Sequence, residues 1–446
     1  MMKVLKLIFL LVMANVLFKP TEIYSQSEGR IDFVEFTLEN GLHVILHEDH
    51  STPIVAVNVC YHVGSKNEKP DKTGFAHLFE HLMFDGSKNV KRGEFDKYIT
   101  QAGGYDNAYT TEDKTNYYEV LPSNYLELAL WLESDRMLGF SIQEISLITQ
   151  REVVKEERRW RYENRPYGSA WIKISEKSFK KHPYRWPVIG YQEHLDRASM
   201  DDVREFYETF YVPNNAVLVI AGDIDIEKTK RLVEKYFAEI PKGPDNIPRP
   251  PAEDELNDSE IREIVEDVNA PLPAVFMSYR IPEEGNEDSY ALALLSNILS
   301  VGESSRLYQR LVYKDKIANE VETYADAREH PGLFLIYAIS NPGFNSDTLE
   351  KVIDEEIEKI KNYGVEEKEL EKAKNKVESA LVAARQTVQG KADLLAHYYT
   401  FYKKPELVNS EIEKYRKVTV DDVKRVAIKY LDRTKRVILH YLPKTN

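Results

Sequence analysis

The sequence predicts an α+β protein of two homologous units, each a mainly antiparallel sheet packed with helices. Two observations predict this class. The order of strand-like and helix-like patterns in the first half recurs in the second half, and a proline-rich acidic stretch separates the halves. The 446 residues are too many for one ordinary core. A hydrophobic content of 42% with 30% charged residues is typical of a globular chain.

A short hydrophobic leader stands in front of the first unit. Lys3 and Lys6 form a basic start, residues 5–18 contain an apolar run, and small or polar residues follow near Ser25. This arrangement predicts a secretory signal peptide over residues 1–25 and export across the inner membrane, to the periplasm. A retained N-terminal anchor is the alternative.

The first predicted unit covers residues 27–243. It opens with a hairpin, because two alternating runs flank Asn40 and Gly41. The period of apolar residues then predicts the remaining elements. They are a strand at 53–65, a helix at 74–84, a strand pair at 103–122, helices at 124–138 and 142–163, and a buried strand at 215–225.

The second predicted unit covers residues 263–446 and follows a proline-rich acidic linker at 244–262. Chance similarity of element order is the alternative to a duplication. The helix at 289–300 contains no histidine or glutamate, so we expect no metal ligands in this domain. The other elements that repeat the first unit are a strand at 273–288, a strand pair at 319–327 and 332–340, helices at 349–363 and 367–386, and a strand at 436–443.

Charge and cysteine content exclude several classes of protein. The net charge of −14 argues against nucleic-acid binding, which needs a basic surface, and does not favour anionic membranes. The single cysteine, Cys60, cannot form an internal disulfide. No stretch after the leader approaches 18 uninterrupted apolar residues, so we expect no further membrane span.

Residues 74–84, GFAHLFEHLMF, place two histidines and a glutamate in an apolar stretch. His77 and His81 are four residues apart and share one helix face, a spacing that suits two imidazoles on one metal ion. A carboxylate at Glu80 can take a proton from a water that the metal activates. The order H-x-x-E-H is a signature of zinc peptidases. Two ordinary helix-face histidines are the alternative, but burying these groups unpaired would be costly.

A catalytic zinc usually has three protein ligands, and residues 149–160, TQREVVKEERRW, offer the third. Glu157 lies three and four residues after Val154 and Val153, on the apolar face of the predicted helix. A carboxylate on that face needs a partner, which a metal would supply. Glu156 falls on the charged face and is the second candidate.

These motifs together resemble the pitrilysin/insulinase family of zinc metallopeptidases, which includes the processing peptidases of mitochondria and many bacterial periplasmic relatives. The resemblance spans about residues 30 to 445 and points to the short bacterial forms rather than the double-length enzymes. It rests on GFAHLFEHLMF, GGYDNAYTTEDKTNYY and REVVKEERRW, and further on HPYRWPVIG, FYVPNNAVLVIAGDID and GESSRLYQRLV.

The resemblance implies that His77, His81 and Glu157 bind Zn²⁺ and that Glu80 is the general base. The family pattern has a supporting glutamate seven residues before the third ligand, where this sequence has Gln150. An amide can form hydrogen bonds but carries no charge. The departure therefore bears on the rate rather than on metal binding.

The resemblance also implies substrate-binding residues. Asn107 and Ala108 match the backbone-contacting pair of the family's edge strand, where an extended peptide can add as a further strand. Arg328 and Tyr337 are the candidates for the arginine and tyrosine with which the second half of family members binds substrate. Taken without the resemblance, the edge strand would be a turn-rich hairpin, Arg328 part of a solvated turn and Tyr337 the edge of a core.

We therefore expect a secreted zinc endopeptidase that cleaves extended peptides or unfolded segments with metal-activated water. A zinc-containing peptide-binding or chaperone-like subunit with little activity is the alternative, which Gln150 keeps open. A lyase or another zinc hydrolase is a weaker third interpretation. Because the larger family members enclose substrate with four units, we expect this two-unit chain to act as a homodimer or as a heterodimer with a related subunit. The sequence does not name the substrate.

Overall fold

The computed structural model describes residues 30–139, 143–252 and 254–444. Ile31–Asn446 form one compact unit. The predicted signal peptide lies outside the described residues. Within the described ranges, no helix has the length and apolar character that a membrane crossing requires.

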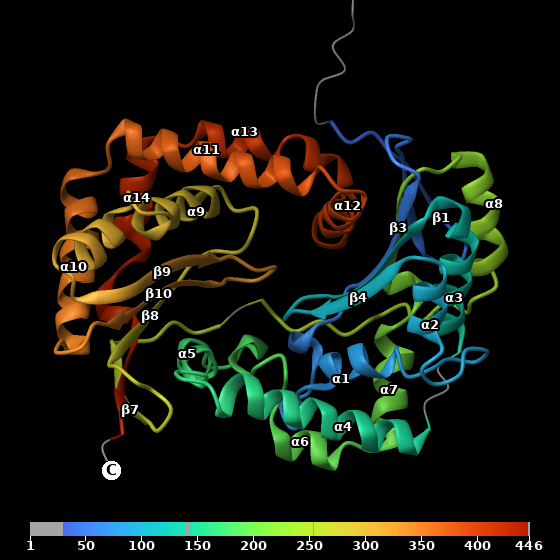
Figure 1. Cartoon of the computed structure of the whole chain (residues 1–446), viewed down its shortest axis with the longest axis horizontal. Coiled ribbons are helices and arrows are strands. Elements are labelled where there is room, and N and C mark those ends of the chain that lie inside the picture. Colours follow the sequence, from blue (N-terminus) through green and yellow to red (C-terminus); the bar gives the residue numbers. More distant parts are fainter. Residues whose placement is uncertain (1–29, 140–142, 253, 445–446) are drawn as a thin grey trace, which may run out of the picture. The chain divides into compact units, whose positions relative to one another are not determined.

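The described strands form two sheets (Figure 1). The first has the spatial order β1 (Val34–Thr37), β2 (His43–Glu48), β6 (Ala216–Gly222), β3 (Ile54–Tyr61), β5 (Thr115–Pro122) and β4 (Tyr105–Thr110). The second has the order β7 (Ile261–Asp267), β11 (Val437–Pro443), β8 (Ala274–Arg280), β10 (Leu333–Ser340) and β9 (Ala318–Asp326).

The two sheets share one topology. β2 pairs with β6 in parallel, and β7 pairs with β11 in parallel. The next three neighbours are antiparallel in both sheets, through β3, β5 and β4 in the first and β8, β10 and β9 in the second. A repeated strand order with the same parallel pair is what an internal duplication produces, and the predicted α+β class of two sheet-and-helix units is confirmed.

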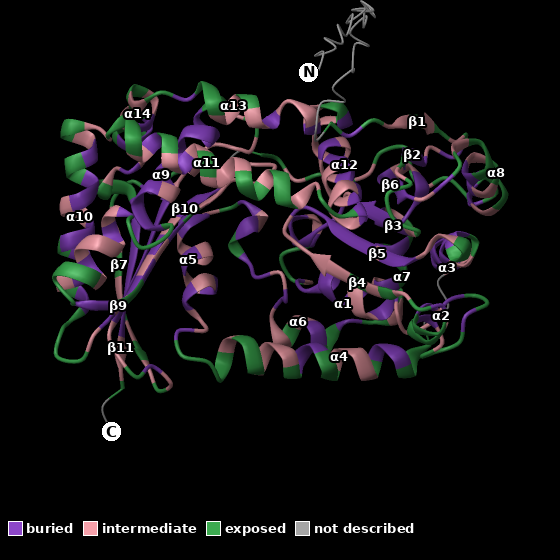
Figure 2. Ribbon diagram, turned by 45° about the horizontal axis from the view of Figure 1, so that its top comes forward, coloured by how far each residue is buried: buried purple, intermediate pink, exposed green. Residues whose placement is uncertain are grey.

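Helices pack on both sheets, and most of them have one buried and one exposed face (Figure 2). In the first half they are α1 (Phe75–Leu82), α2 (Phe95–Gln101), α3 (Leu126–Leu138), α4 (Glu144–Arg158), α5 (Ala170–Ser178), α6 (Gln192–Arg197), α7 (Met200–Phe210) and α8 (Ile226–Phe237). In the second half they are α9 (Glu287–Ser300), α10 (Ser346–Tyr363), α11 (Glu367–Ala384), α12 (Val388–Tyr402), α13 (Glu411–Lys417) and α14 (Val420–Tyr430).

Each half lends one helix to the sheet of the other. α5 packs against β8 and β11 of the second sheet, and α12 packs against β3 and β6 of the first. Ala170 of α5 shares a buried cluster with Phe276, whereas Leu395 of α12 shares one with Val219. The exchange buries apolar surface from both halves in common cores, so it couples the stabilities of the halves.

The segment that joins the halves has no helix or strand in its described residues from 244 to 260. β7 then starts at Ile261, inside the predicted linker, and is a strand that the sequence pattern did not indicate. Its exposed positions alternate Arg262, Ile264 and Glu266, so charge and apolar residues mix on one face. Such mixing is usual on an edge strand and hides its period.

Candidate metal centre

α1 presents the H-x-x-E-H residues because its first turn is firmly held. Gly74, just before the helix, has φ +89°, and a Cβ there would lie 2.8 Å from the Ile189 carbonyl oxygen. The buried Glu68 carboxylate accepts the backbone N–H groups of Gly74 and Ala76, each at 2.9 Å. These bonds satisfy donors that a helix start otherwise leaves unpaired. The start of α1 is therefore fixed.

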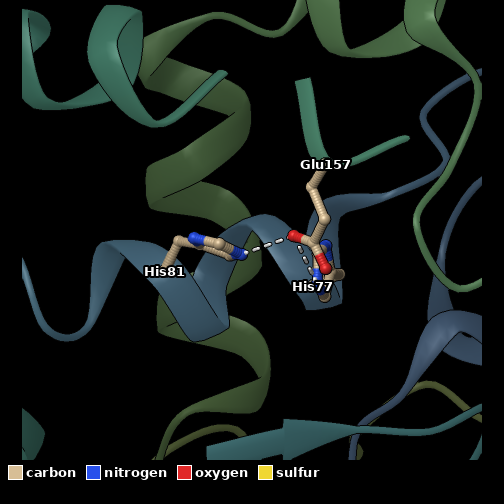
Figure 3. Close-up of side chains that lie close together, drawn as sticks. All are labelled: His77, His81 and Glu157. Atoms are coloured by element: carbon tan, nitrogen blue, oxygen red, sulfur yellow. Dashed lines mark ion pairs between the residues drawn. The ribbon is translucent and has the colours of Figure 1, made fainter. Parts of the chain in front are cut away.

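The structure brings both histidines to Glu157 of α4 (Figure 3). Glu157 Oε2 lies 3.6 Å from His77 Nε2 and 3.3 Å from His81 Nε2. Glu156 instead has a 69% exposed side chain and pairs with Arg159 at 2.6 Å. Of the two glutamates considered from the sequence, Glu157 is therefore the one that reaches the histidines.

The geometry fits a tetrahedral metal ion. Ligands that each bind zinc at 2.0–2.2 Å lie about 3.3 Å apart, close to the two separations above. One ligand atom each from His77, His81 and Glu157 lies within 4.8 Å of the other two. Nδ1 of His77 is buried and has no hydrogen-bond partner among the described residues, which leaves Nε2 as the nitrogen that faces the other ligands. Two imidazoles and one carboxylate are the donor set of a catalytic zinc site.

Electrostatics prepare these groups for a cation. Burial, together with the neighbouring His81, lowers the pKa of His77 to about 4, so the ring is neutral at pH 7. Burial acts to raise the pKa of Glu157, but the hydrogen bond from His81 and the positive charge of Arg161 oppose it, and the pKa lies below its ordinary value. Arg161 Nε is 3.0 Å from Glu157 Oε1. A neutral imidazole and an ionised carboxylate are the forms that bind metals.

Glu80, on α1, faces the edge strand β4. Thr110 of β4 donates a hydrogen bond from Oγ1 to Glu80 Oε2 at 2.5 Å. Burial raises the pKa of Glu80, and the Thr110 bond opposes that rise. A raised pKa is useful to a carboxylate that must accept and return a proton.

Gln150 does not contact the ligands directly. Its Nε2 donates to Asp85 Oδ1 at 3.1 Å, in the segment that follows α1. Arg92 Nε donates to the same oxygen at 2.9 Å. Gln150 therefore joins α4 to the end of the metal-binding helix.

Asn107 and Ala108 lie on β4, which forms one edge of the first sheet in the described chain. Their cross-strand partners on β5 are Tyr118 and Tyr117. Asn107 is exposed, and its side chain accepts the backbone N–H of Ala108 at 2.8 Å. The outer edge of β4 is thus available for backbone pairing beside Glu80.

Arg328 and Tyr337 lie apart from each other. Arg328, in the β9–β10 turn, has an 11% exposed side chain that pairs with Glu112 and Asp326. Tyr337 lies on β10, donates to Glu320 at 2.5 Å and stacks on Phe276. It also lines a cavity, whereas the charge of Arg328 is matched within the chain.

That cavity has a volume of about 770 Å³ and borders the metal centre. Arg161, which pairs with Glu157, forms part of its wall. Its other lining residues are mainly aromatic: Trp160, Tyr162, Tyr167, Trp171, Phe276 and Tyr324.

Three residues of the centre did not emerge from the sequence: Thr110, Arg161 and Asp85. Arg161 could have been found, because it lies four residues after Glu157 on a continuous helix and i,i+4 charge pairs stabilise helices. Thr110 and Asp85 carried no such signal. Their partners are set by packing between elements.

A second group of acidic and histidine side chains lies in the other half. Asp347, Glu350 and His440 approach one another closely enough to bind a metal. Arg262 and Arg436, however, both form ion pairs with Glu350. Two guanidinium groups supply the charge that a cation would bring, so this group is an ion-pair network.

The class of the protein follows from three features: an H-x-x-E-H motif on a helix, a glutamate that meets both histidines, and an adjacent sheet edge. Together they are typical of a zinc protein of the metallopeptidase type.

Comparisons with known sequences agree. Residues 43–190 match the family described as Insulinase (Peptidase family M16), and residues 197–377 match the Peptidase M16 inactive domain. Zinc protease PqqE of Helicobacter pylori is 30% identical over 416 residues, which cover 91% of this chain and 92% of that protein. The uncharacterized zinc protease YmxG of Bacillus subtilis is 27% identical, with 80% and 85% covered.

Solved structures agree as well. The crystal structure of a protease from Helicobacter pylori has a TM-score of 0.88 at 30% identity and covers 93% of this chain and 100% of that one. The M16 inactive domain from Pseudomonas fluorescens has a TM-score of 0.82 at 18% identity, with 93% and 98% covered. The chain belongs to the M16 insulinase family of peptidases, and Zn²⁺ is its metal.

Proposed function

We propose that this protein is a zinc endopeptidase that cleaves extended peptides or unfolded polypeptide segments. The observation that carries the proposal is the Thr110–Glu80 hydrogen bond. It places the candidate base between the zinc ligands and a free sheet edge. A peptide that pairs with β4 would therefore run directly past the base.

The substrate would bind as an added strand. Backbone groups of Asn107 and Ala108 on β4 would form the hydrogen bonds of an antiparallel or parallel edge pairing, with the Ala108 N–H exchanging the Asn107 side chain for the peptide. This mode requires an extended segment, so folded substrates are excluded until they open. Main-chain recognition also makes the sequence of the substrate secondary to its conformation.

Each polar group of the centre has a role in hydrolysis. Bound zinc supplies a Lewis acid that polarises the scissile carbonyl and acidifies water. The Glu80 carboxylate accepts the proton of the attacking water and returns it to the departing amine nitrogen. Thr110 orients Oε2 of that carboxylate, and Arg161 pairs with Oε1 of Glu157, which leaves Oε2 toward the two histidines.

Selectivity would come from the aromatic cavity beside Arg161. Its volume of about 770 Å³ holds a large side chain. Tyr337 forms part of the wall, which supports a substrate-facing role for this residue. No comparable support exists for Arg328, whose charge is already paired.

The test is digestion of an unstructured peptide library with the zinc-loaded protein. We expect cleavage that a zinc chelator abolishes and added zinc restores. Glu80→Gln should retain zinc and lose activity by about 10²-fold or more, since general base catalysis contributes about 10²–10⁴-fold. If Glu80→Gln cleaves at the rate of the unaltered protein, Glu80 is not the general base. If the zinc-loaded protein leaves the library intact, the proposed peptidase activity is wrong.

A peptide-binding subunit with little activity is the second candidate. Gln150 favours it, because an uncharged residue stands where the family pattern has a glutamate. Under this alternative the same library binds, as measured by fluorescence anisotropy, but emerges uncut. The two candidates therefore differ in one measurement on the same sample.

Export and assembly complete the proposal. The basic and apolar pattern at the start of the sequence supports secretion to the periplasm. Exposed apolar side chains on α4 and just after it support a partner: Ile145, Ile148, Val153 and Trp160 are 53%, 47%, 44% and 63% exposed. A second copy or a related subunit on this face would also shield the metal centre from bulk water.

A further inference from the structure

The hydrogen bond between Gln150 and Asp85 joins a helix on the surface to a carboxylate that is nearly buried. The Asp85 side chain is only 7% exposed. Its Oδ2 is buried and has no hydrogen-bond partner among the described residues. A buried carboxylate with few donors is costly, so the two donors to Oδ1, from Gln150 and Arg92, are its main compensation.

Gln150 and Glu157 share one face of α4. Seven residues separate them, and a heptad returns to the same azimuth within about 20°. A carboxylate about 6 Å from the helix axis moves by about 2 Å when the helix turns by 20°. Zinc ligands tolerate errors of only about 0.2 Å. A contact that fixes the rotation of α4 at Gln150 therefore also fixes the position of the Glu157 carboxylate.

The other polar anchors of α4 act from a different side of the helix. Lys155 Nζ lies 2.8 Å from Asp196 of α6. Arg158 donates to the carbonyl of Gly190 at 2.7 Å. These contacts hold α4 against α6 and the loop before it. On the side that faces α1, the corresponding anchor is Gln150 with Asp85.

We propose that Gln150 and Asp85 are positioning residues that hold Glu157 in register with His77 and His81. The pair ties the ligand-bearing side of α4 to the segment after α1, so that the three ligands are in place before zinc arrives. The inference rests on the zinc ligands of the proposed function. It does not depend on peptidase activity.

The uncharged amide is essential to this arrangement. An amide donates to the Asp85 carboxylate, whereas a carboxylate at position 150 would place two negative charges about 3 Å apart and push α4 away from α1. The polarity of the contact matters more than the identity of either residue. Reversing it should therefore preserve the function of the pair.

The experiment measures zinc affinity by competition with a chromogenic chelator in the absence of peptide. For Gln150→Glu we expect zinc affinity to fall about 10-fold to 100-fold, as when a group that orients a metal ligand is lost. Adding Asp85→Asn should restore affinity to within about threefold of the unaltered protein, because the introduced amide then donates to the introduced carboxylate. Thr149→Glu adds the same charge one residue away and should change affinity by less than about threefold.

Unchanged affinity in Gln150→Glu would overturn the proposal, and so would a double variant that binds zinc no better than the single one. If Gln150→Glu does not fold, as judged by its melting temperature, Gln150→Met replaces it. That variant loses the hydrogen bond without adding charge, so zinc affinity equal to that of the unaltered protein would also overturn the pair. A peptidase that fails on all substrates would leave these affinities unaffected, so the two failures are distinguishable.

Discussion

Arg328 Nη2 lies 3.0 Å from Glu112 Oε1, and this ion pair joins the β9–β10 turn of the second half to the β4–β5 turn of the first. The two turns occupy equivalent positions in the duplicated topology. Arg328 also pairs with Asp326 at 2.6 Å and lies over the Tyr184 ring, 4.9 Å from its centre. The arginine is thus a contact between the halves beside the edge strand β4.

Arg328→Gln should destabilise the protein more than it affects substrate binding. Removing one member of this partly buried pair, whose side chains are 11% and 25% exposed, leaves the other charge uncompensated and costs at most about 3 kcal/mol. The measurement is a urea unfolding curve together with KM on the best library peptide. Arg328→Gln/Glu112→Gln should recover part of the lost stability. A normal unfolding curve with a strongly raised KM would instead assign Arg328 to the substrate.

His81→Ala should remove zinc, whereas His50→Ala should not. His81 Nε2 faces Glu157, while His50 is 60% exposed and pairs with Asp223 on the surface. Losing one of three ligands should lower bound zinc to well under half an equivalent after dialysis. Metal content by atomic emission decides the result. Equal zinc in both variants would exclude His81 as a ligand.

Thr110→Val should lower kcat by about 10-fold, because an unanchored Glu80 spends less time in the productive orientation. Zinc content should stay at the level of the unaltered protein, since Thr110 does not contact a ligand. Thr100→Val, an exposed position on α2, is the control. A kcat equal to that of the control would show that the hydrogen bond is dispensable.

His62→Gln should flatten the acid dependence of stability. Burial lowers the pKa of His62 to about 4 despite its bond to Glu329. The unfolded histidine, at about 6.5, binds its proton first, so the unfolded state holds more protons between about pH 6.5 and 4. Stability therefore falls as the pH drops through this window, by at most about 3 kcal/mol from this residue. The introduced amide can still donate to Glu329 and does not titrate.

Urea midpoints at pH 7 and pH 4.5, measured on zinc-free samples of both proteins, check this prediction. The difference between the two midpoints should be smaller in His62→Gln. The pKa of Glu329 lies below this pH window. Its bonds to His62 and Lys66 outweigh burial and lower that pKa to about 2. Its contribution is lost only as the pH falls from about 4.5 toward 2. Equal differences in the two proteins would contradict the assignment.

The active form should contain two chains. Light scattering and peptidase activity, measured over the same dilution series, test this expectation. Activity should fall together with mass as pairs separate, and Ile148→Glu on the exposed face of α4 should shift this fall to higher concentration. A monomer with full activity at nanomolar concentration would show that one chain suffices. A single chain that becomes active only with a related subunit would point to a heterodimer.

Local periodicity accounts for what could be predicted from the sequence. The four-residue spacing of His77 and His81 and the position of Glu157 near Val154 follow from the helix alone. The strand and helix order of each half follows from apolar alternation, and it led to the duplicated α+β architecture that the sheets display. β7 was not predicted, because this edge strand mixes charged and apolar residues on its exposed face.

Only the tertiary structure decided which residues of distant segments meet. Thr110 reaches Glu80 across 30 positions of sequence, and Glu329 reaches His62 across 267. The exchange of α5 and α12 between the sheets likewise brings together segments that are distant in the sequence. The sequence by itself determined the ligand spacing and the repeated order of elements, because both repeat with the period of one helix or strand. The partners of Glu80, Gln150 and Arg328 depend on how whole elements pack, and no short-range pattern records that packing.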